Sequence, residues 1–230
     1  MSKQPAARAF YIAIALSIVL PFIPILKFGL LPFDYLNTHL HELFHALAAL
    51  ATGGSVDHIE VFSTAAGVTY TRGGVSIIIY MAGYLGASLF GSAMVQYANS
   101  EKAAQIWMRV LGGLVLGSSV LCVRGDAVGW TLGLAWPVII LFLAARLKGD
   151  QLLFAAQFFA VQQCLNAVKS LRDLILLSGS TTTTDAQLLA DATHVPAIIW
   201  ALVWTAVSLF GIALAVIHIN RQVKKPNPTI

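Results

Sequence analysis

The sequence has few charged residues for its length. Asp, Glu, Lys and Arg make up only 10% of its 230 residues, whereas soluble domains contain about 25%. Hydrophobic residues account for 58%, and the mean hydropathy is +0.79. This composition excludes an ordinary soluble domain. It predicts an integral membrane protein with the lipid bilayer around most of its helices.

Cysteines and basic clusters are scarce as well. The two cysteines, Cys122 and Cys164, fall in apolar segments, which argues against a disulfide framework or a cysteine-rich metal site. The net charge of +4 is ordinary for a bacterial inner-membrane protein whose cytoplasmic loops collect Lys and Arg, and we expect that location. No stripe of basic and aromatic residues indicates a nucleic-acid partner. The sequence does not define an oligomeric state.

Apolar segments follow one another along the whole chain. They cover residues 9–31, 35–52, 75–97, 103–123, 127–147, 151–177 and 195–217. We predict a single membrane-embedded domain over residues 1–230, an all-α polytopic bundle of about six to seven transmembrane helices. The first segment contains Pro21 and Pro24 and has no small-residue cleavage site, so we expect an uncleaved, kinked span. Seven crossings would separate the two basic chain ends, against the positive-inside rule, and the sequence leaves this topology open.

Residues 55–72 differ from the apolar segments on either side. Ser55–Val61 and Gly67–Arg72 alternate polar and apolar residues, and Ser63–Ala66 supply a turn. This pattern predicts a β-hairpin. In a helical membrane protein, such a backbone is stable only where protein or water covers it.

The stretch from His41 to His45 reads HELFH, which has the form HExxH. On an α-helix, residues four apart share a face, so His41 and His45 can bind one metal ion. Glu42 lies about 100° around the helix from His41, where it can reach a metal-bound water without binding the metal. Two His and a Glu in an apolar segment predict a zinc site with an adjacent general base.

A second polar group lies in the apolar segment 151–177. Gln162, Asn166, Lys169 and Asp173 are spaced by four, three and four residues, so they form one stripe on a helix. Charged groups at membrane depth cost about 2.5–3.5 kcal/mol at the centre and usually have a function. We therefore expect Asp173 to complete the zinc site. The alternative is that Asp173 marks the aqueous end of the segment and pairs with its basic neighbours.

Four stretches of the chain resemble the small branch of the site-2-protease-like intramembrane metalloproteases. They are HELFHALAALATGGSVDHIEVFSTAAGVTYTRGG, MAGYLGASLFG, CLNAVKSLRDL and TTDAQLLADATHVPAIIW. The resemblance implies zinc bound by His41 and His45, with Glu42 activating water. In better-known members an Asp in a later span, within a stretch ending Asp-Gly, completes the site. This sequence has no Asp-Gly, so Asp185 is a second candidate ligand, although it can also cap a short helix.

These features predict a zinc-dependent metallopeptidase that cleaves membrane-protein or peptide substrates. Asn166 either stabilises the oxyanion or hydrogen-bonds a neighbouring helix. The hairpin offers an edge to which an extended substrate can add as a strand. The alternative is a non-proteolytic membrane protein, either a metal-ion carrier or an inactive relative that acts as a binding scaffold. Of the remaining histidines, His39 is expected to be a helix-end or supporting residue, and His58 and His194 have no assigned role.

Overall fold

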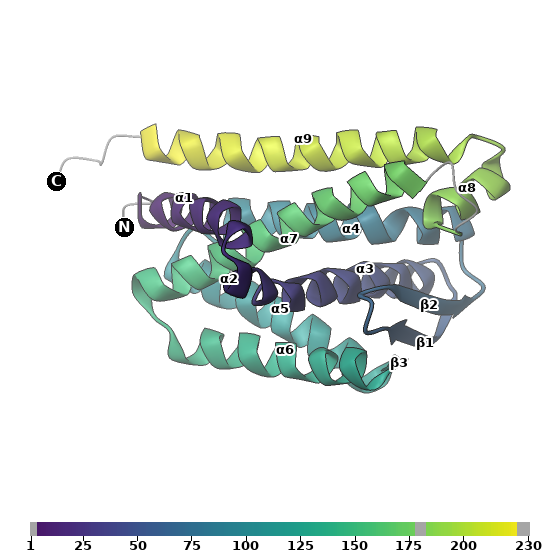
Figure 1. Cartoon of the computed structure of the whole chain (residues 1–230), viewed down its shortest axis with the longest axis horizontal. Helices are drawn as coiled ribbons and strands as arrows, with labels where there is room; N and C mark the ends of the chain where they lie inside the picture. The colour runs from purple at the N-terminus through teal and green to yellow at the C-terminus, as the bar shows by residue number, and fades with distance from the viewer. Residues whose placement is uncertain (1–3, 178–182, 225–230) are drawn as a thin grey trace.

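The computed structural model describes residues 4–177 and 183–224. Long helices run alongside one another, and a small sheet covers one end of the bundle (Figure 1). The elements are α1 (Gln4–Val19), η1 (Leu20–Phe22), α2 (Pro24–Phe28), α3 (Leu31–Ala51), β1 (Ser55–Val61), β2 (Gly67–Arg72), α4 (Ser76–Tyr97), α5 (Glu101–Leu121), β3 (Val123–Gly125), α6 (Ala127–Arg146), α7 (Gly149–Leu177), α8 (Asp185–Thr193) and α9 (Ala197–Lys224). The predicted all-α membrane bundle with a short hairpin is confirmed.

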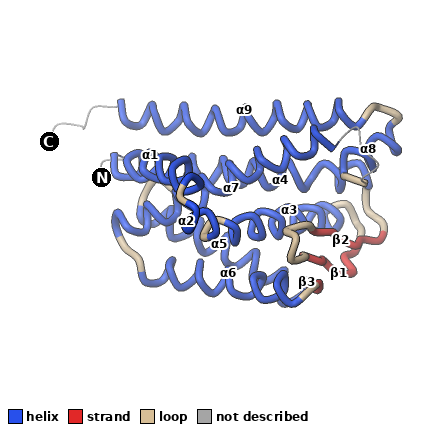
Figure 2. Tube along the Cα trace, in the orientation of Figure 1, coloured by secondary structure: helices blue, strands red, loops and turns tan. Residues whose placement is uncertain are grey.

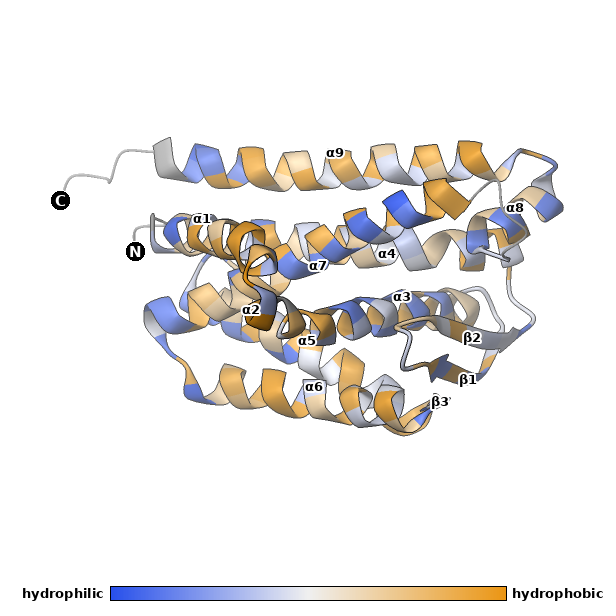
Figure 3. Cartoon of the chain, viewed as in Figure 1, coloured by the Kyte–Doolittle hydropathy of each residue, from blue (hydrophilic) through white to orange (hydrophobic). Residues whose placement is uncertain are grey.

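Among the described residues, five helices are long and apolar enough to cross a membrane. They comprise residues 5–22, 76–97, 101–121, 127–146 and 197–222. Two other long helices, α3 and α7, carry more polar residues, and polar turns are visible along α7 in Figure 3. α7 packs against α1, α4 and α9, so its polar side chains can face protein instead of lipid.

The first apolar segment was expected to form one kinked span, but it is divided into separate helices. α1 ends at Val19, a 3₁₀ turn and the short helix α2 follow, and α3 begins as a separate helix at Leu31. Pro21, Pro24 and Pro32 lie at or near these starts, because proline lacks the N–H that an interior helical position requires. α1 packs on α7 and α9, whereas α3 packs on α4 and the hairpin. The two helices therefore succeed one another along the bundle (Figure 1).

The sheet has the strand order β2-β1-β3 (Figure 2). β1 and β2 form the predicted antiparallel hairpin. β3, which the sequence analysis did not predict, pairs with β1 in parallel, with Ile59 opposite Val123. The side chains of Ile59, Val61 and Val123 are buried with Ala46 of α3. This apolar contact holds the sheet against the helix that carries HExxH.

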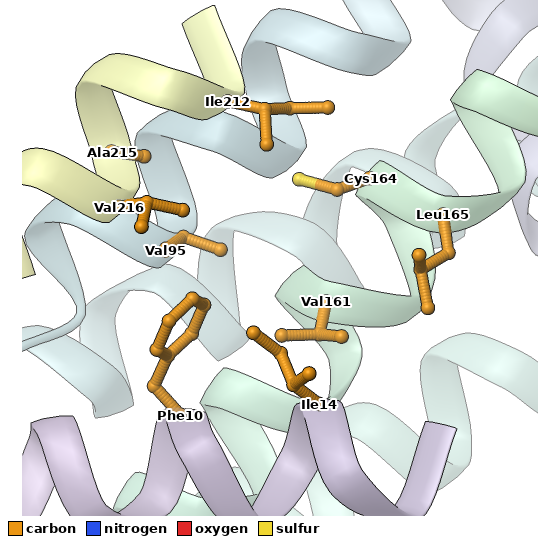
Figure 4. A pocket seen from close by; sticks show the side chains of 9 residues that line it. All are labelled: Phe10, Ile14, Val95, Val161, Cys164, Leu165, Ile212, Ala215 and Val216. Carbon is orange, nitrogen blue, oxygen red and sulfur yellow. The ribbon is translucent and has the colours of Figure 1, made fainter. Parts of the chain in front are cut away.

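An apolar cavity of about 80 Å³ lies between α1, α4, α7 and α9. Figure 4 shows that its nine lining side chains, among them Phe10, Val95 and Cys164, carry no nitrogen or oxygen. None of the HExxH residues lines it. Hydrolysis needs ionisable or metal-binding groups, so the candidate site must be sought elsewhere.

Candidate metal centre

α3 places His41 and His45 one turn apart on the same face. Their Nε2 atoms lie 3.0 Å from one another, and the rings meet edge to face with centroids 4.6 Å apart. His45 is only 5% exposed. The predicted pairing of the two imidazoles is therefore present in the structure.

The carboxylate of Asp185 lies at both imidazoles. Its Oδ2 is 3.0 Å from Nε2 of His41 and 3.1 Å from Nε2 of His45. Asp185 is the first residue of α8, and Thr184 before it is the N-cap, accepting a hydrogen bond from the backbone N–H of Gln187. Because Thr184 provides the cap, the carboxylate of Asp185 is free to point at α3.

Asp173 does not belong to this group. Its Oδ1 pairs with Nη2 of Arg172 at 2.9 Å, and its side chain is 45% exposed. The structure thus supports the alternative of an ion pair near the end of α7 and disagrees with the expectation that Asp173 joins the two histidines. Helical spacing placed Asp173 on the polar face of α7, but it could not show which helix that face meets.

Two other members of the polar stripe on α7 contact neighbouring helices. Gln162 donates a hydrogen bond to Ser17 of α1 at 3.2 Å, and Lys169 pairs with Asp34 of α3 at 2.7 Å. Nδ2 of Asn166 is buried and has no hydrogen-bond partner within the described residues. The predicted role of Asn166 at an oxyanion stays a prediction.

A backbone contact fixes the orientation of His45. Its Nδ1 lies 2.6 Å from the carbonyl oxygen of Ile79 on α4. A carbonyl can only accept, so Nδ1 carries the proton and Nε2 keeps the lone pair that faces His41 and Asp185. Histidines that bind metals commonly have their second nitrogen held in this way.

The donor set fits a zinc ion. Two imidazole nitrogens and one carboxylate oxygen are ligands that zinc takes, at about 2.0–2.2 Å. Ligands at such distances around a tetrahedral ion lie roughly 3.3 Å apart, close to the 3.0–3.1 Å measured here. All three ligand atoms lie within 4.8 Å of one another. The group therefore offers three candidate ligand atoms, close enough together to share one ion.

Gly83 of α4 keeps space open beside the imidazoles. A Cβ at this position would lie 2.6 Å from Nε2 of His41 and nearer still to Nε2 of His45. The next residue, Tyr84, packs its ring edge to face on His41, with centroids 4.5 Å apart, and stacks on Trp204. α4 thus supplies both the gap and one wall of the centre.

Glu42 is buried beside the centre and held by β2. It is 5% exposed, and the hydroxyl of Thr69 lies 2.7 Å from its Oε2. A Cβ on Gly67 would lie 2.8 Å from Cγ of Glu42, so the strand can approach only because residue 67 has no side chain. The hairpin therefore closes directly over the glutamate.

The surroundings of Asp185 favour the ionised form of its carboxyl group. Burial by itself would raise the pKa of this carboxyl, but the neighbouring His45 and His41 lower it, and the pKa lies below its usual range. The ionised form, which is the form that binds metals, is thereby favoured.

The other histidines lie away from this centre. Nε2 of His39 is 2.7 Å from the hydroxyl of Ser118 on α5, and its expected supporting role at the metal centre stays a prediction. His58 stacks on Tyr70 and lies near Asp57 and Glu60 on the hairpin. His194 ends α8 in the left-handed conformation, with φ of 59°.

Several residues of the site were not found from the sequence. Thr69 and Gly83 occupy positions that an alternating strand and a small-residue helix face already explain. Ile79 contributes only its backbone oxygen, so its side chain carries no signal. The alternation of the hairpin could have placed Gly67 and Thr69 on one face, but nothing in the sequence shows that this face meets Glu42.

The fold and the site together define a polytopic helical membrane protein with a His-His-Asp candidate metal centre beside a buried glutamate. A family model described as Peptidase M50B-like matches residues 9–215. The chain therefore belongs to this family, which is the site-2-protease family, and the predicted resemblance is confirmed. Searches of the curated proteins and of the solved structures give no match.

Proposed function

We propose that the protein is an intramembrane zinc metallopeptidase that hydrolyses peptide bonds of membrane-protein substrates. The observation that carries the proposal is the approach of Oδ2 of Asp185 to both HExxH imidazoles, with Glu42 adjacent. His41, His45 and Asp185 would hold the zinc ion. Bound zinc supplies Lewis-acid polarisation of the scissile carbonyl and activation of water.

The side chains around the centre have separate tasks in this proposal. The carboxylate of Glu42 takes a proton from the attacking water and returns it to the leaving amine. The Ile79 carbonyl keeps the proton of His45 on Nδ1, so that Nε2 stays available as a ligand. Thr69 holds the carboxylate of Glu42 in place. Burial of Glu42 excludes bulk water, which strengthens these polar interactions.

The substrate-binding element in this proposal is β2. It is an edge strand, since the sheet order is β2-β1-β3, and edge strands pair readily with an extended peptide. Peptide bonds inside a helix are shielded by their own hydrogen bonds, so a membrane-helix substrate must be locally extended. Strand addition beside Thr69 would hold an extended segment near Glu42.

The test is Glu42→Gln in the purified, zinc-loaded protein, with cleavage of a membrane-protein substrate and zinc content measured together. We expect cleavage to fall at least 10²-fold, the lower end of the contribution of a general base, while zinc content stays at the wild-type level. Unchanged cleavage in this variant would reject the mechanism. Zinc flux across liposomes that survives Glu42→Gln, without any cleavage by the wild type, would instead support a carrier.

A further inference from the structure

A polar side chain one turn before HExxH lies on the same side of α3. Asn37, His41 and His45 follow one another at intervals of four residues, so they share one face of the helix. Asn37 is 5% exposed, as buried as His45. A buried polar group without a partner costs about 1–3 kcal/mol. The hydrogen bonds of Asn37 therefore show which element this face of α3 contacts.

Both polar atoms of the Asn37 side chain bond to α7. Nδ2 of Asn37 donates to the hydroxyl of Ser170 at 3.1 Å, and Oδ1 accepts from Nε2 of Gln163 at 2.6 Å. Gln163 is itself 5% exposed. Gln163 and Ser170 are seven residues apart, which is about two helical turns. One side chain of α3 is thus held at two heights along α7. We call Asn37, Gln163 and Ser170 the amide bridge.

The amide bridge is suited to fix the position of α3 on α7. Apolar contacts are not directional, whereas a hydrogen bond weakens steeply when its angle is lost. In coiled coils a single buried Asn specifies the register of the helices. Another polar contact between α3 and α7 pairs Lys169 with Asp34, but the lysine side chain is 52% exposed. Exposed ion pairs contribute only about 0–1 kcal/mol, so the buried bridge is the stronger constraint on the height and rotation of α3.

α7 also belongs to the packing that holds α8. One buried apolar cluster joins residues of α7, α8 and α9, among them Leu171, Leu174, Ala186, Leu189 and Trp204. Leu171 directly follows Ser170, which bonds to α3. Ala186 directly follows Asp185, whose carboxylate lies at both imidazoles. Consecutive residues of α7 thus contact the helix that carries the histidines and the cluster that holds α8.

We propose that Asn37 and Gln163 are positioning residues of the metal centre. By fixing α3 on α7, which shares its buried cluster with α8, the amide bridge sets where the two imidazoles lie relative to the carboxylate of Asp185. Loss of the bridge should then weaken metal binding more than an equal loss of stability elsewhere on α7. The proposal concerns the donor atoms alone, so it holds whether or not a bound metal serves peptide hydrolysis.

Two neighbouring glutamines of α7 provide a matched pair of variants. Gln162 and Gln163 are 4% and 5% exposed, and each donates one hydrogen bond to another helix. Gln163 donates to Asn37 of α3, whereas Gln162 donates to Ser17 of α1. Methionine at either position keeps an unbranched side chain of similar length and removes the amide. The two variants therefore lose comparable contacts, but only Gln163→Met breaks the amide bridge.

The test is titration of the full-length protein in detergent with zinc and with cobalt, whose visible spectrum reports the ligand geometry. Thermal unfolding measures the stability of each variant. We expect Gln163→Met and Asn37→Leu to bind zinc about 10-fold more weakly, the lower end of the loss for residues that support metal ligands, with an altered cobalt spectrum. Gln162→Met should lose comparable stability and keep the wild-type affinity and spectrum. Equal zinc affinity of Gln162→Met and Gln163→Met would overturn the proposal.

Variants of Ser170 cover the case in which a glutamine or asparagine variant does not fold. Ser170→Ala removes the acceptor of the Asn37 hydrogen bond, and Ser170→Thr keeps a hydroxyl there. We expect weaker zinc binding in the alanine variant and nearly wild-type binding in the threonine variant, and equal affinities would overturn the proposal. Asn37→Leu combined with Gln163→Met should bind zinc as Asn37→Leu does, because both changes break the same bond.

A measurement on the metal-free protein separates this proposal from the proposed function. The imidazole resonances of His41 and His45 are followed by NMR in protein labelled with ¹⁵N at histidine. We expect them to move in Gln163→Met and to stay at their wild-type positions in Gln162→Met. A wild-type protein that shows this pattern but binds no zinc would reject the proposed function and leave the positioning role standing. Resonances that do not move in Gln163→Met would overturn the positioning role.

Discussion

The hydroxyl of Thr69 lies 2.7 Å from Oε2 of Glu42 and 2.9 Å from the backbone carbonyl oxygen of the same residue. One strand residue thus contacts both the side chain and the helix backbone of the proposed general base. Since β2 is also an edge strand, the element proposed to bind substrate is the element that positions Glu42. Thr69 is therefore a positioning residue. It orients Glu42 and does not need to contact the candidate metal-binding atoms itself.

Replacing Thr69 separates positioning from binding. Thr69→Val keeps the shape of the side chain and removes the hydroxyl, whereas Thr69→Ser keeps the hydroxyl. A hydrogen bond to a charged group contributes about 1.5–3 kcal/mol, so we expect kcat of the valine variant to fall by about 10- to 100-fold. KM and zinc content should change little, and serine should restore most of kcat. A loss shared equally by valine and serine would show that the methyl group matters instead.

The two aspartates considered as third ligand can be compared directly. Asp185→Ala removes the carboxylate that approaches His41 and His45, while Asp173→Ala breaks only an exposed pair with Arg172. Loss of a supporting residue around a metal typically costs 10–100-fold in affinity, so we expect loss of a ligand to cost more. Zinc titration of both variants checks this. Equal zinc affinity of Asp185→Ala and wild type would remove Asp185 from the site.

Gly83 should be intolerant of the smallest side chain. In Gly83→Ala the new methyl group would lie within 2.6 Å of His41 and would push the imidazoles from their shared position. We expect loss of zinc binding and of cleavage, with the helical circular dichroism preserved. Gly113→Ala on α5 is the matched control, because a Cβ there meets nothing within 4 Å. A zinc-binding Gly83→Ala variant would show that the space beside the imidazoles is not required.

Asp126 connects the hairpin to α6 in a pH-dependent manner. The backbone N–H groups of Gly129 and Ser63 lower the pKa of this carboxyl. Its stabilising contribution is therefore present above the ordinary Asp pKa of about 4 and is lost as pH falls through the lower folded-state pKa. At neutral pH, Asp126→Ala should increase hydrogen exchange at the Ser63 amide, whereas Asp150→Ala should not. Exchange rates that are equal in Asp126→Ala and wild type would show that this contact does not hold the hairpin.

The parts of the molecule set by local sequence were predictable. The HExxH spacing places both histidines on one face of a helix, and they lie there in the structure. The alternation in residues 55–72 predicted the hairpin, which also lies where expected. β3 has only three residues, too few to show alternation. Pro21 and Pro24 predicted a kink, but whether the helix resumes in line or as a separate helix depends on what each half packs against.

The choice of the third carboxylate depended on tertiary structure. Asp173 had the stronger local signal because it lies on a polar stripe, and Asp185 had an ordinary explanation as a helix cap. In the structure Thr184 caps α8, Arg172 pairs with Asp173, and the carboxylate of Asp185 lies at both imidazoles. α8 packs on α4 and α9, and this packing brings Asp185 to His41 and His45, which lie 144 and 140 residues earlier in the chain. No spacing rule within one helix contains that information.

β3 pairs in parallel with residues 59–61 of β1 and has only three residues, so β2 is the longer of the two edge strands of the sheet. In a peptide that adds as a strand beside β2, successive residues would alternate between facing α3 and facing away. Every second side chain of a bound peptide would lie on the side of the sheet that carries Gly67 and Thr69. The side chains between them would point away from that side. Selectivity of this kind has a period of two, so cleavage-site preferences should be sought at alternate positions and not in a contiguous motif.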